Sequence, residues 1–143
     1  MTTALRDAID HTALGWVKPE IDETLRQARL EIEAFAESPG DGERMRACVG
    51  YLHQVQGTLR MLELPEPADY LNGVRSYVAI ELIGKRRVPG GQQLDTLADA
   101  MASLEYYLEA LRERRPNRDE ILDITRSSLE KLRYWPVPAD EAA

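Results

Sequence analysis

The stretch GERMRACVGYLHQVQGTLRMLEL, residues 42–64, decides the fold class of this chain of 143 residues. Its apolar side chains recur at intervals of three and four residues, the spacing that places them on one face of an α-helix. They are Met45, Cys48, Leu52, Val55, Leu59 and Leu62. Pro65 and Pro67 follow at once, and because proline disrupts a helix interior, the helix is predicted to end before them.

The same helical period recurs along the rest of the chain. Residues 3–14 form a short predicted helix that Gly15 is placed to end, and residues 38–41 are placed to end the next helix. The apolar stripes are Ile21, Leu25, Ala28, Ile32 and Phe35 in residues 17–41; Leu71, Val74, Val78 and Leu82 in 68–86; Leu94, Leu97, Met101, Leu104, Leu108 and Leu111 in 94–114; and Ile121, Ile124, Leu129 and Leu132 in 116–136.

The composition agrees with this pattern, since helix formers dominate and β-branched and aromatic residues are sparse. The predicted connections are short, which favours antiparallel neighbours in a bundle. We therefore predict an all-α fold: an up-and-down antiparallel four-helix bundle with an additional N-terminal helix. Residues 1–143 are expected to form a single domain, because no linker or repeat divides them.

Charge and cysteine content exclude several classes of function. The formal net charge is −7, and the arginines alternate with acidic residues, so nucleic acid is not an expected partner. Cys48 is the only cysteine, which rules out a disulfide within the chain and a thiolate metal cluster. No stretch resembles a signal peptide or a membrane span, so we expect a cytoplasmic protein that does not insert into a membrane.

His53 stands out within the helix of residues 42–64. At 100° per residue it lies roughly 130° from the centre of the apolar stripe, so its imidazole should point toward solvent. Gly50 and Gly57 are its neighbours on the helix surface, and each costs about 0.8–1 kcal/mol relative to alanine. Two interpretations stay open: the glycines give a partner protein access to the ring, or they mark a close helix crossing or a bend beside an ordinary surface histidine.

The residues around His53 supply no second group for catalysis. Cys48 falls on the apolar stripe and is interpreted as a packing residue. His11 is far away in sequence and no carboxylate lies four residues from His53, so neither a metal site nor a cofactor is expected. A lone histidine is still a competent nucleophile toward an activated phosphoryl group when a partner supplies magnesium and charge.

The segment HQVQGTL, residues 53–59, resembles the histidine-phosphotransfer (HPt) motif, in which lysine and glycine occupy the third and fourth positions after a phosphorylated histidine. Residues 1–64 are similar to the N-terminal HPt region of the large hybrid chemotaxis-type histidine kinases that govern type IV pili and twitching motility. Residues 66–138 resemble a later segment of the same kinases, so the chain joins or shortens two pieces of a longer protein under this interpretation. The resemblance implies an HPt-like bundle.

The resemblance also implies a phosphorelay function. His53 would accept and pass a phosphoryl group, and Gly57 would open the surface to the receiver domain of a response regulator. The kinase catalytic domain would be the other partner, since this chain has no ATP-binding domain. Gln56 stands at the lysine position, where it can donate a hydrogen bond but carries no charge. The expected binding residues are Gly50, Gln54, Gln56, Gly57, Arg46 and Arg60.

Two alternatives remain beside the phosphocarrier. In one, which Gln56 favours, the bundle is a pseudo-HPt scaffold that binds signalling partners without being phosphorylated. In the other, the bundle forms a homodimer through exposed apolar residues such as Met61 and Leu64.

Other conspicuous residues are interpreted as structural. Tyr107 is expected to pack in the core, and the cluster Lys85 to Arg87 is expected to stabilise a helix C-terminus rather than to recognise an anion. Trp16 and Trp135 could pack together to close one end of the bundle.

Overall fold

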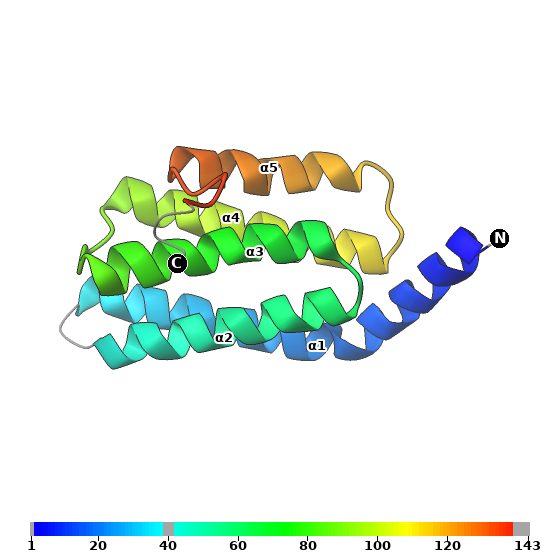
Figure 1. Ribbon diagram of the computed structural model, residues 1–143, viewed down its shortest axis with the longest axis horizontal. Helices are drawn as coiled ribbons and strands as arrows, with labels where there is room; N and C mark the ends of the chain where they lie inside the picture. Colours follow the sequence, from blue (N-terminus) through cyan, green and yellow to red (C-terminus); the bar gives the residue numbers. More distant parts are fainter. Residues whose placement is uncertain (1, 39–41, 139–143) are drawn as a thin grey trace.

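Helices form almost the whole of the protein, whose computed structural model describes residues 2–38 and 42–138, with side chains at 12–38 and 43–138 (Figure 1). The elements are α1 (Thr2–Glu37), α2 (Gly42–Met61), α3 (Pro65–Tyr77), the π-helix η1 (Val78–Gly84) that continues α3, α4 (Gly91–Arg112) and α5 (Arg118–Lys131). Within the described residues there is no strand. The predicted all-α class is confirmed, while most of the predicted stop at 38–41 lies outside the described residues.

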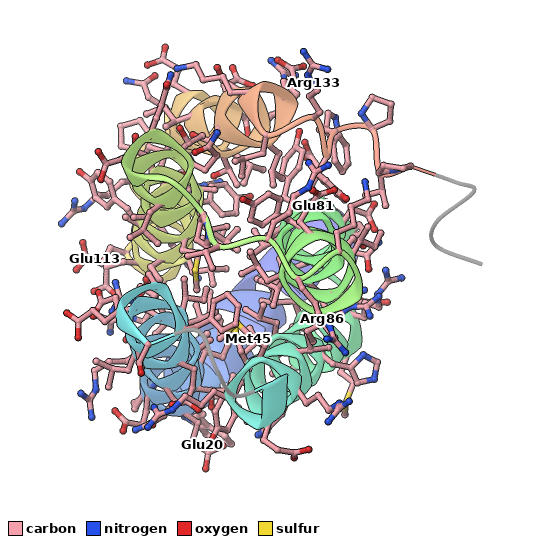
Figure 2. All side chains as sticks on the ribbon, turned by 90° about the vertical axis from the view of Figure 1, so that its left-hand side faces the viewer. Glu20, Met45, Glu81, Arg86, Glu113 and Arg133 are labelled. Carbon is pink, nitrogen blue, oxygen red and sulfur yellow. The ribbon has the colours of Figure 1, made fainter. Side chains whose placement is uncertain are left out.

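Successive helices run in opposite directions along the long axis of the molecule (Figure 1). Helix α1 packs on α2 and α4, and α3 packs on α2, α4 and α5. Helices α1 to α5 share one hydrophobic core, to which α5 contributes Leu122 and Leu129 while it packs on α4 and α3. Seen end-on in Figure 2, Met45 points into this core from α2.

Most of the predicted apolar stripes are buried as expected. Every stripe residue of α1 and of α3 with η1 is buried, and so are Tyr107 and the central stripe residues of α4. Helix α5 differs, because Ile124 is 53% exposed and Ile121 only half-buried. Leu122 and Thr125 face the core instead, since they share the helix face of Leu129 and Leu132, at spacings of three, four and seven residues.

The N-terminal residues do not form a helix of their own. Helix α1 runs without interruption through both Gly15 and Pro19, so the predicted end at Gly15 is wrong. Leu14 and Lys18, on either side of Gly15, are both buried, which keeps this segment helical. A glycine inside a helix costs only about 1 kcal/mol relative to alanine, so Gly15 does not end it. The first turns of α1 extend beyond the other helices (Figure 1).

The two tryptophans do not meet. Trp16 is 82% exposed on α1, whereas the ring of Trp135 packs on Tyr70, with 4.5 Å between the ring centroids. The chain after α5 folds back along α3, which brings Tyr134 edge-on to Tyr77 at 5.5 Å. The predicted contact between Trp16 and Trp135 is therefore wrong, because the Trp16 ring is exposed on α1 while the Trp135 ring packs on α3.

Helices α2, α4 and α5 each end on a residue with left-handed backbone that is not glycine. These residues are Glu63, Arg114 and Arg133, with φ of 60°, 56° and 67°. In each case the next residue donates its backbone N–H to the carbonyl five residues earlier, at 2.9 Å, which completes a Schellman-type helix end. Glycine is missing at these positions, so it could not mark the ends; for α2 the prediction came from Pro65 and Pro67 instead.

A buried hydroxyl pair joins α4 to α5. The Oγ atoms of Ser103 and Thr125 lie 2.7 Å apart, and Ser103 also bonds the carbonyl of Ala100 at 3.0 Å. Thr125 is fully buried, so its hydroxyl depends on Ser103 for a partner.

We expect Ser103→Ala to lower the free energy of unfolding by about 1–3 kcal/mol, because it leaves the Thr125 hydroxyl buried and unpaired. The double variant Ser103→Ala/Thr125→Val should recover most of this loss, since no unpaired hydroxyl remains. Urea denaturation of both single variants and the double variant measures the coupling. Strict additivity of the two single changes would contradict the pairing.

Candidate functional site on helix α2

Helix α2 is held in one orientation by the side chains of its apolar stripe. Met45, Cys48, Leu52 and Leu59 are all fully buried. The Cys48 thiol donates to the backbone carbonyl of Ala28 on α1 at 3.5 Å. Burial raises the pKa of Cys48 to about 12, so the thiolate is not formed at neutral pH. The interpretation of Cys48 as a packing residue is confirmed.

The opposite side of α2 is an open surface around His53. His53, Gly50 and Gly57 are all exposed, as the helical wheel predicts. A Cβ atom added at Gly50 or at Gly57 would meet nothing within 4 Å. No neighbouring helix approaches these glycines, so the interpretation as a close helix crossing is wrong. We call His53, Gln54, Gly50 and Gly57 the α2 face.

An apolar groove borders the α2 face. It lies between α1 and α2, holds about 240 Å³, and is lined in part by Val17, Ile21, Val55 and Leu62. Met61, which is 85% exposed, stands at its edge. Gln54 lines the groove and is also part of the α2 face, so the two form one continuous surface.

Gln56 points away from the α2 face. It is only 7% exposed, and its Oε1 accepts a hydrogen bond of 3.1 Å from Nε of Arg75 on α3. Arg75 also donates from Nη2 to Oδ1 of Asn72 at 2.5 Å. Gln56 thus serves as a link between α2 and α3. Sequence reasoning missed Arg75 and Asn72, because contacts across two helices leave no signal in either helix alone.

The two arginines predicted to supply positive charge both pair with carboxylates. Arg46 bonds Glu43 within α2 at 2.6 Å, and Arg60 contacts Asp69 on α3 at 3.4 Å. Both pairs are solvent-exposed, so each contributes at most about 1 kcal/mol. Their guanidinium groups are nevertheless directed toward carboxylates, and their charge is locally neutralised.

The α2 face combines an exposed imidazole with two positions that carry no side chain. Across the residues that the structure describes, no three His, Cys, Asp or Glu side chains come together as a metal site, and no helix is both long and apolar enough to cross a membrane. An exposed imidazole flanked by two side-chain-free positions allows another backbone to approach closely.

These features define the class of the protein: an all-helical domain that presents an open, glycine-flanked helix face. The chain belongs to the FimL C-terminal domain family, whose sequence profile matches residues 11–129. The assignment to the HPt domain of a histidine kinase stays a prediction.

A relative supports the family. The chain is 35% identical over 109 residues to the protein named Scaffold protein FimL of Pseudomonas aeruginosa strain PAO1, and the match covers 76% of this chain and 19% of that protein. The chain thus spans about a fifth of the length of this relative. No solved structure matches the chain.

Replacing either glycine of the α2 face by alanine should stabilise the protein. Because Gly50 and Gly57 lie in a helix with open space around them, Gly50→Ala and Gly57→Ala should each raise the free energy of unfolding by about 0.5–1 kcal/mol. Thermal or urea denaturation measures the change. Destabilisation by either alanine would mean that packing, and not access, requires the glycine.

The contact between Gln56 and Arg75 predicts that lysine and glutamate at position 56 affect stability differently. Gln56→Lys should lower the free energy of unfolding by about 1–3 kcal/mol, because it places a cation against Arg75 and removes the acceptor. Gln56→Glu, of nearly the same size, keeps an acceptor for Arg75 and should stay within about 1 kcal/mol of the unchanged protein. Equal stability of the two variants in urea would show that the Arg75 contact contributes little.

Proposed function

We propose that this domain is a protein-binding scaffold module of a type IV pilus chemosensory pathway. It uses an HPt-like four-helix arrangement of α1 to α4, acts in the cytoplasm, and binds a signalling partner through the α2 face without being phosphorylated. Two findings support the proposal: membership in the FimL C-terminal domain family, and the similarity to a protein named as a scaffold.

The observation that carries the proposal is the orientation of Gln56. In the HPt motif this position holds a lysine, which would supply charge for a phosphohistidine. Here the residue is neutral, turned into the α2–α3 interface and occupied by Arg75. Arg46 and Arg60 are paired with carboxylates, so phosphate on His53 would have to displace Glu43 or Asp69 to gain a cation.

The shape of the surface supports docking. Gly50 and Gly57 keep the α2 face low, so a partner helix or loop can lie against the backbone of α2. The adjoining groove offers apolar surface at Val17 and Met61, where an apolar side chain of the partner can be buried. We propose the receiver domain of a response regulator as the partner, with the kinase catalytic domain of the same system as an alternative.

Phosphotransfer through His53 is the second candidate function. The exposure of His53 favours it, because a receiver aspartate could reach the ring without any movement of α2. In this case His53 is the phosphoacceptor, and the partner supplies magnesium and most of the charge. A homodimer through Met61 and Leu64 is a third candidate, supported only by the exposure of Met61.

Binding and phosphorylation assays separate these functions. The receiver domain and the kinase core of the pilus chemosensory system from the same genome are titrated against the chain, and we expect micromolar binding of at least one. Gly57→Arg should weaken this binding at least about tenfold by filling the open surface, while His53→Gln should bind normally. Ala102→Arg, an exposed position on α4, is the matched control for added charge and should have no effect.

The same samples are incubated with a phosphorylated donor that labels a known HPt domain. We expect no acid-labile, base-stable phosphate on the chain. Label on the unchanged protein that disappears in His53→Gln would overturn the scaffold proposal in favour of the phosphocarrier. Binding that is unaffected by Gly57→Arg would remove the α2 face from the interaction.

A further inference from the structure

A large pocket lies at the end of the molecule where η1, the start of α4 and the end of α5 meet. It holds about 870 Å³, a volume in the range of small-molecule sites. Figure 2 looks onto this end, with Arg133 at the end of α5 and Glu81 on the helix below it. The pocket takes residues from η1, from the loop before α4 and from the end of α5, so only the assembled fold creates it.

A polar cluster around Glu81 lines the pocket. Tyr134 donates its hydroxyl proton to Oε2 of Glu81 at 2.6 Å. Glu81 also forms ion pairs with Lys85 at 3.1 Å and with Arg87 at 3.3 Å. Burial would raise the pKa of Glu81, but the hydrogen bonds from Tyr134 and Lys85 and the charges of Lys85 and Arg87 outweigh it and lower that pKa. Glu81 is therefore ionised, and its charge is already matched.

Among the described residues that line the pocket, cations outnumber carboxylates. The cations are Lys85, Arg87, Lys131 and Arg133, and the carboxylate is Glu81, which pairs with Lys85 and Arg87. No described carboxylate lies within ion-pair distance of Lys131 or of Arg133. The chain as a whole is acidic, with a net charge of −7, and other surface cations mostly pair with acidic side chains, so this local group of cations is unusual.

Helix ends alone do not account for this arrangement. Lysine and arginine are favoured at a helix C-terminus, which explains Lys131 on α5 and agrees with the predicted role of Lys85 after η1. The two helix ends, however, direct their cations into one shared cavity, and cations confined in a concave site repel each other unless an anion joins them. Arginine in particular presents a fork of N–H donors that matches phosphate oxygens.

We propose that this pocket binds a small phosphate-bearing molecule. Lys131 and Arg133 contact the phosphate groups, and Arg87 contributes a third cation while Glu81 and Tyr134 hold the wall in place. The inference does not rest on the scaffold function, since the α2 face contributes no residue to the pocket.

Calorimetric titration tests the site with two probes, pyrophosphate and ATP without magnesium. The unchanged chain should bind at least one of them with a dissociation constant below about 1 mM, and more weakly as salt is raised. Lys131→Gln/Arg133→Gln should weaken the binding at least about tenfold. Arg26→Gln/Arg114→Gln removes the same charge from exposed positions outside the pocket and should leave the affinity within about twofold.

Backbone amide chemical shifts recorded during the titration locate the ligand, and the expected changes fall on η1, residues 85–93 and the end of α5. Circular dichroism checks that both double variants are folded. Absence of binding of either probe at 10 mM, equal loss in both double variants, or shifts confined to other elements would overturn the proposal. Binding of a hexaglutamate peptide to the pocket in place of either phosphate compound would likewise overturn it, in favour of an acidic protein partner.

Discussion

Burial of one stripe of α2 is the constraint on which the remaining structure depends. Each large apolar side chain of that stripe contributes about 1.5–3 kcal/mol when fully buried, so the stripe far outweighs the cost of about 2 kcal/mol for two glycines in the same helix. Because a helix turns by a fixed 100° per residue, burying the stripe also fixes the direction of every other residue. His53 must then face outward, and Gln56 must reach the edge of α3.

Directional polar contacts fix how the other helices sit on this core. Lys18 on α1 is only 5% exposed, and its Nζ bonds Asp22 at 2.6 Å and Glu109 on α4 at 3.2 Å. The hydrogen bond from Arg112, assisted by Lys18 against the opposing effect of burial, lowers the pKa of Glu109 to about 2. Such contacts form in only one register, whereas apolar packing alone would allow neighbouring helices to slide.

The two candidate surfaces differ in chemistry because they arise in different ways. The α2 face belongs to a single helix, is open, and combines small residues with a bordering apolar groove, as suits another protein. The second candidate surface is the concave, cationic pocket, which forms only where η1, the start of α4 and the end of α5 meet. Under the two proposals, a protein partner would occupy one surface while a small anion occupies the other.

The sequence by itself determined the helical class, most of the core and the outward direction of His53, because all three follow from periodicity along one helix. It failed where the answer depends on a second element. Helix continuity through Gly15 depends on the burial of Leu14 and Lys18, and the true face of α5 depends on α4, where Ser103 meets Thr125. Only the tertiary structure decided that Gln56 is engaged by Arg75, and that four cations gather with Glu81, since such contacts join residues far apart in sequence and no local pattern encodes them.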